Sequence, residues 1–117
     1  MKSEICRNLV IICVFIGFDI LTGLLKSFSQ GSYESSKMRA GLFHKLGELI
    51  AFALCVTVDV FAPQLEIVIP FKLSGAVTVY IALMEIGSIV ENIGIMNPDI
   101  GKYLTGIFEK VREREEK

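Results

Sequence analysis

Three long apolar runs constrain what this chain of 117 residues can fold into. The first run forms a helix of about 31 Å over residues 5–25, which is enough to cross the hydrocarbon core of about 30 Å in a lipid bilayer. Hydrophobic residues make up 52% of the chain, and no long polar region remains for a separate soluble domain. We therefore predict an all-α membrane protein, folded as a single domain over residues 1–117. Its predicted transmembrane helices cover about residues 5–25, 46–62 and 71–93.

A polar segment between the first two runs carries basic residues that predict the orientation of the chain. Basic residues in short loops remain on the cytoplasmic side of a membrane. This segment is therefore expected inside the cell, which places the N-terminus outside and the C-terminus inside. A serine near the end of the segment, Ser35 or Ser36, is the expected N-cap of the second helix. The topology-determining residues are Lys26, Lys37, Arg39 and Lys45.

Each apolar run also carries small or polar residues on one helical face, because they recur at intervals of three and four. In lipid, small side chains let helices pack closely, and ionisable ones are costly unless they are paired or hydrated. We interpret these faces as seams, either inside one subunit or between subunits, where they can also line a pore. The seam residues are Asp19, Thr22 and Gly23 in the first run, Gly47, Ala51, Cys55 and Asp59 in the second, and Ser74, Thr78, Ala82 and Glu85 in the third.

The acidic residues inside the predicted spans lie at different depths. Asp19 and Glu85 lie roughly 9 to 12 Å from the inner boundary, given the helical rise, and Glu48 lies near the basic segment. Asp59 lies near the outer end, one short hairpin from Lys72, and these two charges can neutralise each other. Two interpretations remain open. The acids pair inside one three-helix bundle, or they face a subunit seam or an aqueous hole.

A fourth helix of different character is predicted over residues 98–115. Asn97 is a suitable cap, Pro98 suits the first helical position, and Asp99 suits the positive end of the helix dipole. The apolar stripe that follows is too short to span a bilayer but suits its interface. Docking on another chain and disorder are the alternatives. The predicted interfacial residues are Ile100, Leu104, Ile107 and Phe108.

The sequence offers no candidate for catalysis, cofactor binding or metal binding. It shows no nucleophile beside a base, no cluster of metal ligands and no glycine-rich phosphate loop, so an enzyme is not expected. Nucleic acid is not an expected partner. A small oligomeric ion channel or transporter subunit would also carry acids in its spans, and an assembly subunit would also carry small-residue seams. These classes remain alternatives.

Several motifs of the chain resemble one family over nearly its whole length. FDILTGLLKS is followed by SSKMRAGLFHKLGELI, by an aspartate in the second span, and by EIGSIVENIGIMNP after the third. The most specific part is Asp19 with Thr22 and Gly23, followed by a Ser-Lys pair, Gly41 and Lys45. This combination resembles the toxin-secretion and phage-lysis holin family.

The resemblance implies a phage or prophage protein that accumulates in the bacterial cytoplasmic membrane. There it would oligomerise with itself into large lesions that release or activate a wall-degrading endolysin and so lyse the host. Membrane lipid and further copies of the chain are the implied partners. Endolysin is a functional partner that needs no direct contact, and an antiholin is a further candidate. Some holins use two nearby start codons, but the next methionine here is Met38, which does not support a second start.

Overall fold

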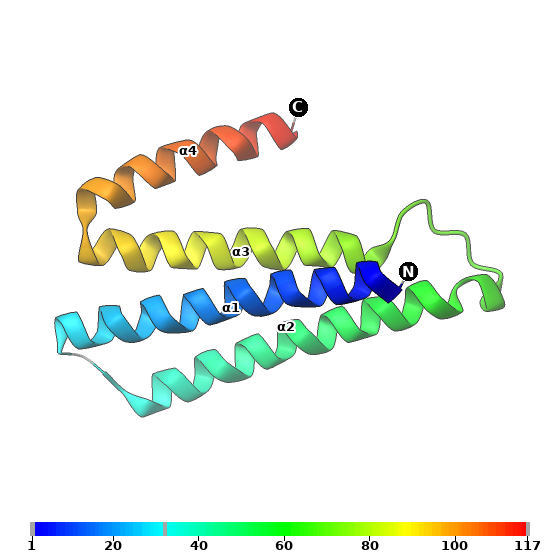
Figure 1. The fold of residues 1–117 in the computed structure, drawn as a ribbon, viewed down its shortest axis with the longest axis horizontal. Coiled ribbons are helices and arrows are strands. Elements are labelled where there is room, and N and C mark those ends of the chain that lie inside the picture. Colours follow the sequence, from blue (N-terminus) through cyan, green and yellow to red (C-terminus); the bar gives the residue numbers. More distant parts are fainter. Residues whose placement is uncertain (1, 32, 117) are drawn as a thin grey trace.

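The computed structural model describes residues 2–31 and 33–116, which form helices joined by short connections (Figure 1). Helix accounts for 89% of the structure, and the described residues contain no strand. The prediction of an all-α membrane protein with three long apolar helices is confirmed. The elements are α1 (Lys2–Gln30), α2 (Ser35–Phe61), the 3-10 turn η1 (Pro63–Leu65), α3 (Leu73–Met96) and α4 (Pro98–Glu116).

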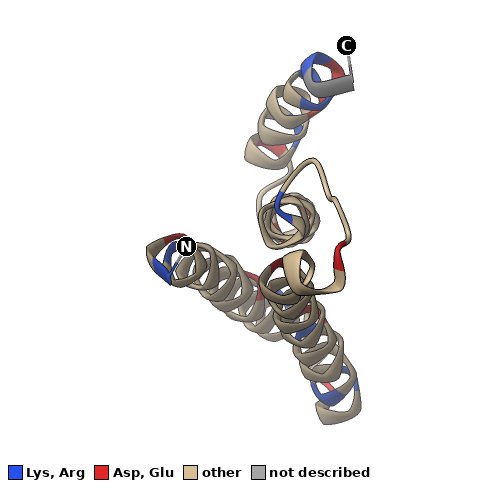
Figure 2. Ribbon diagram, turned by 90° about the vertical axis from the view of Figure 1, so that its right-hand side faces the viewer, with Lys and Arg blue, Asp and Glu red and all other residues tan. Residues whose placement is uncertain are grey.

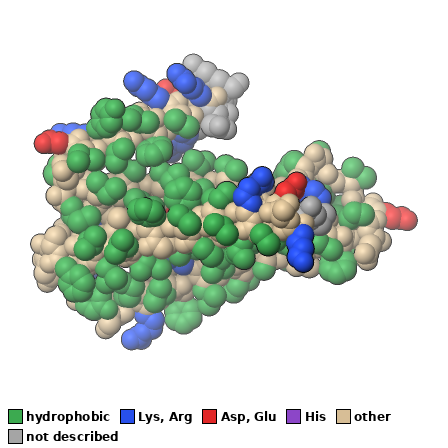
Figure 3. Space-filling view, viewed as in Figure 1, with side chains coloured by type: hydrophobic (Ala, Val, Ile, Leu, Met, Phe, Trp, Pro, Cys, Tyr) green, Lys and Arg blue, Asp and Glu red, His purple; other side chains and the backbone are tan. Residues whose placement is uncertain are grey.

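Helices α1, α2 and α3 are each long and apolar enough to cross a membrane. Their 29, 27 and 24 residues correspond to about 36 to 44 Å of helix, which exceeds the hydrocarbon core of a bilayer. The helices therefore continue past the predicted spans into their polar flanks. Large apolar side chains cover the visible surface of these helices (Figure 3), as expected for a surface in contact with lipid.

Helix α3 lies at the centre of the arrangement. Figure 2, viewed along the length of the bundle, shows α1 and α2 on one side of α3 and α4 on the other. Helix α1 packs extensively on α3, α2 packs on α3 less extensively, and α1 and α2 have little direct contact. The apolar core is formed where the first three helices meet, by Ile12, Ile16, Phe52 and Ile81.

The ends of α2 are set by its neighbours in the sequence. Glu34 occupies the N-cap position without a side-chain cap bond, so the expectation that Ser35 or Ser36 caps this helix is wrong. Both serines lie in the first turn instead. At the other end, Pro63 begins η1, and Glu66 then turns the chain with a left-handed φ of 59°. An extended stretch leads from there to α3.

Helix α4 begins as the sequence predicts and then folds back beside α3 (Figure 1). The N–H of Ile100 donates to the side-chain oxygen of Asn97 at 3.3 Å, and Pro98 is the first helical residue. Gly101 is buried, and a Cβ atom at this position would collide with the backbone of Gly94. These two glycines therefore let α4 cross close to α3. The predicted interfacial side chains lie on the free surface of α4 or at its edge: Ile100, Ile107 and Phe108 are exposed and Leu104 is half-buried.

Candidate functional site

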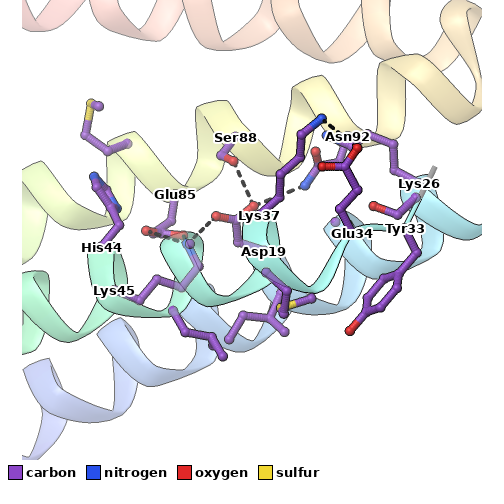
Figure 4. Close-up of a pocket in the computed structure, with 17 residues that line it drawn as sticks. Asp19, Lys26, Tyr33, Glu34, Lys37, His44, Lys45, Glu85, Ser88 and Asn92 are labelled. Carbon is purple, nitrogen blue, oxygen red and sulfur yellow. Dashed lines mark hydrogen bonds and ion pairs between the residues drawn. The ribbon is translucent and has the colours of Figure 1, made fainter.

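A lysine and two carboxylates, one from each of α1, α2 and α3, meet inside the bundle (Figure 4). The ammonium of Lys45 donates to Asp19 Oδ2 at 2.5 Å and to Glu85 Oε2 at 3.0 Å. Only 12% of the Lys45 side chain, 9% of the Asp19 side chain and 3% of the Glu85 side chain are exposed. We call these residues the charged network. It links the three apolar helices through charge-assisted hydrogen bonds.

Polar side chains of α1 and α3 complete the surroundings of Asp19. Its Oδ1 atom accepts hydrogen bonds from Ser88 Oγ at 2.8 Å and from Asn92 Nδ2 at 3.1 Å. The amide of Asn92 also donates to Thr22 Oγ1 at 3.0 Å. The spacing of three and four residues brings Glu85, Ser88 and Asn92 onto the face of α3 that meets α1. Both oxygens of the Asp19 carboxylate are thus bonded.

Acidic side chains outnumber basic ones at this site. Lys45 supplies one cation for the carboxylates of Asp19 and Glu85, and Glu48 of α2 approaches Glu85 as a further acid. His44 Nδ1 lies 3.5 Å from Glu48 Oε1, which is buried and has no hydrogen-bond partner among the described residues. Uncompensated charge is expensive inside a membrane. The site is therefore stable only while the helices remain together or while water has access to it.

A cavity of about 410 Å³ adjoins the charged network between α1, α2 and α3 (Figure 4). It reaches toward the connection between α1 and α2, where Lys26, Tyr33 and Lys37 contribute to its lining. A water molecule occupies about 30 Å³ in the liquid, so the cavity has room for several. Water can therefore hydrate the network from this end of the bundle.

A second polar contact joins α2 to α3 at the opposite end. Asp59 Oδ1 accepts from the N–H of Leu73 at 2.8 Å, and Oδ2 accepts from the N–H of Ser74 at 2.9 Å. The carboxylate thus satisfies the free donors at the start of α3 and lies at the positive end of its dipole. The sequence predicted that Asp59 and Lys72 neutralise each other. In the structure, the carboxylate bonds to the backbone that directly follows Lys72, and the charge of Lys72 also lies near it.

The structure brings together the predicted seams of α1 and α3 and leaves that of α2 partly outside. Thr78 is satisfied within its own helix, since its hydroxyl donates to the carbonyl of Ser74 at 2.6 Å. Gly23 approaches Asn92, whereas a Cβ atom on Gly47 would meet open space. The buried seam residues are Asp19, Thr22, Ser74, Thr78 and Glu85, the half-buried ones are Gly23, Ala51, Cys55, Asp59 and Ala82, and Gly47 is exposed.

The role of Lys45 inside the bundle was not visible in the sequence. Among the basic residues of the polar segment, Lys37 and Arg39 are exposed and Lys26 is half-buried, and Lys45 turns its ammonium inward. One feature of the sequence is consistent with this inward placement: Lys45 is the basic residue nearest to the second apolar run. Its part in setting the orientation of the chain remains a prediction.

Three long apolar helices that enclose a lysine and two acidic side chains define a small multi-spanning membrane protein. The bacteriophage holin family matches residues 4–113, and the chain belongs to this family. The resemblance inferred from the sequence motifs is thereby confirmed. Proteins of this family form pores in membranes and are not enzymes. No curated protein and no solved structure matches the chain significantly.

Proposed function

We propose that this protein is the holin of a phage or prophage and acts in the cytoplasmic membrane of the bacterial host. It accumulates there, oligomerises, and forms lesions through which endolysin reaches the cell wall, so that the host lyses. The observation that carries this proposal is the charged network of Asp19, Lys45 and Glu85, enclosed by helices whose outer surface is apolar.

The network suits a protein that is first harmless and later opens. In one copy Lys45 pairs with Asp19 and Glu85, and the outer surface of the helices is mostly apolar, so the copy can accumulate without disturbing the membrane. Separating the helices would expose carboxylates to hydrocarbon, at a cost of about 2.5 kcal/mol or more for each charge at mid-depth. Water in a lesion removes that cost. The open form is therefore favoured only where enough copies assemble to enclose water.

The orientation and the fourth helix fit this proposal. We place the N-terminus outside and the C-terminus inside, because Lys26, Lys37 and Arg39 lie at the end of the bundle that holds the connection between α1 and α2. We assign α4 to the inner membrane interface, where its exposed Ile100 and Phe108 can enter the lipid.

Inducing the protein in bacteria with and without a co-expressed endolysin tests the proposal. We expect a sudden loss of respiration in both cultures, and lysis only in the culture that also makes endolysin. Continued growth of cells whose membranes demonstrably contain the protein would contradict the proposal. A graded ion leak that never lets a folded enzyme pass would instead favour a small ion channel.

A further inference from the structure

We propose that α2 is an exchangeable helix, which in the oligomer leaves its own α1 and α3 and packs on those of a neighbouring copy. Lys45 of one copy then pairs with Asp19 and Glu85 of the next. This inference rests on the proposed function, because it describes how the assembled state keeps its charges paired.

The first reason is that α2 is the least embedded of the three apolar helices. It has little contact with α1, and Phe52 is its one buried side chain among the residues described. What holds it against the other helices is Phe52 in the middle, with the partly buried Leu49 and Val56 beside it, and a polar contact toward each end, through Lys45 and Asp59. Helix α1, in contrast, packs extensively on α3.

The second reason is that the surface under α2 is complementary to another copy of α2. Without α2, this surface presents the carboxylates of Asp19 and Glu85 at one end and unpaired N–H groups of Leu73 and Ser74 at the other. To pair these groups, the surface needs a cation and a hydrogen-bond acceptor about 21 Å apart. This is the length of fourteen residues of helix, which is the separation of Lys45 and Asp59 along α2. Lipid chains supply neither group. A second α2 supplies both, in the antiparallel register that the first one uses.

The third reason is that the connections are long enough for the movement. Residues 62–72 join α2 to α3, and eleven residues reach about 36 Å when extended. Residues 31–34 join α1 to α2 and reach about 13 Å. Neighbouring helices lie about 8–10 Å apart, so both connections permit α2 to shift by one helix position.

Exchange also explains why assembly would grow beyond a pair. Each copy that donates α2 to a neighbour leaves its own α1 and α3 surface open for the α2 of another copy, so head-to-tail exchange closes into a ring or continues as an arc. Every contact of the single copy is re-formed in the assembly. The obstacle is the transient exposure of Asp19 and Glu85, which delays the process until copies lie close together.

Crosslinking between two differently tagged copies tests the exchange, in a background where Cys6, Cys13 and Cys55 are replaced by serine. One copy carries Phe52→Cys on α2 and the other carries Ile81→Cys on α3. Both positions belong to the buried cluster, and the antiparallel register set by the Lys45–Glu85 and Asp59–Ser74 contacts places them opposite each other. With a short membrane-permeable bis-maleimide, we expect crosslinks between the two tags to rise several-fold when respiration collapses.

A matched control separates exchange from crowding. Leu54 lies on the exposed side of α2, so a Leu54→Cys copy mixed with the Ile81→Cys copy should crosslink several-fold less. Equal yields for the two mixtures would overturn the exchange. Should the Phe52 replacement prevent insertion, Val56→Cys with Val77→Cys provides a milder pair, because both side chains pack against the same cluster.

A single copy that carries both Phe52→Cys and Ile81→Cys gives the complementary test. When it is crosslinked within itself before triggering, α2 is locked and the loss of respiration should fail. Lesions made by locked copies would overturn the exchange and leave the holin function intact. Failure of the protein with its native cysteines to collapse respiration would count against the proposed function instead.

Discussion

Lys45 carries the charge on which two buried carboxylates depend. Its ammonium bonds to Asp19 and Glu85, and all three side chains are almost inaccessible. A buried ion pair adds little net stability compared with an apolar replacement, but removing one partner leaves a charge without compensation. The stability of the three-helix arrangement therefore depends on the balance of charge within the charged network, more than on the identity of any one residue.

We predict that Lys45→Met destabilises the three-helix arrangement by about 3–5 kcal/mol, because two buried carboxylates lose their counter-charge. The level of inserted protein, measured by immunoblot of membranes, should fall sharply. Lys110→Met is the matched control, since Lys110 is exposed and lies outside the charged network, and it should insert normally. Adding Asp19→Asn and Glu85→Gln to Lys45→Met should restore insertion. Failure of this rescue would show that Lys45 acts in some other way.

We predict that Asp19→Asn and Glu85→Gln change the time of lysis at matched protein levels. Each replacement keeps the shape of the side chain but removes a charge that makes helix separation costly, so the mutants should insert and trigger at a shifted time or not at all. Lysis curves decide the outcome. Normal timing in both mutants would remove these residues from the proposed seam and leave the fold unaffected.

Among the helices, α4 depends most on a single close contact. Gly101 has no room for a Cβ atom against the backbone of Gly94, whereas a Cβ atom on Gly106 would meet nothing within 4 Å. The crossing of α3 and α4 is therefore set by backbone approach, and the apolar stripe of α4 remains largely free.

We predict that Gly101→Ala displaces α4 from α3, because the added methyl group must move one backbone away from the other, at a cost of about 1–3 kcal/mol. Proteolysis of α4 in inverted membrane vesicles should become faster. Gly106→Ala lies one and a half turns further along the same helix and should leave the rate unchanged. Equal rates for both variants would mean that α4 does not rest on α3 in the membrane.

For the molecule as a whole, the two ends of the bundle differ in chemistry. The end with the connection between α1 and α2 carries Lys26, Lys37 and Arg39, and the polar cavity reaches toward it. The opposite end carries Lys2, Arg7 and Lys72 beside Glu4 and Glu66, and η1 exposes the apolar side chain of Leu65. The basic residues clustered around the short connection between α1 and α2 favour the cytoplasmic side for that end.

We predict that a cysteine at Ser36, in a background without native cysteines, resists an impermeant thiol reagent in spheroplasts before lysis. The control is a cysteine at Gln64 of η1, at the other end of the bundle, which should react readily. Both residues are exposed, so access from the outer solution decides the result. The reverse labelling pattern would overturn the proposed orientation.

The helices and their faces were predictable, because the period of a helix and the length of an apolar run are local properties. The apolar runs predicted α1, α2 and α3, and Asn97 with Pro98 predicted the start of α4. Spacing by three and four also placed Thr22 beside Asp19 on one face and Ser74, Thr78 and Glu85 on another.

The pairing of these faces was decided by the tertiary structure. Lys45 meets Asp19 across 26 residues and Glu85 across 40, and Asp59 caps a helix that begins 14 residues later. Such contacts depend on how three helices rotate and slide against one another, which the pattern within any single helix does not specify. The sequence alone therefore determined that acidic residues lie within the membrane helices. Only the packing of α2 against α1 and α3 determined that a lysine assigned to the polar segment pairs with two of them.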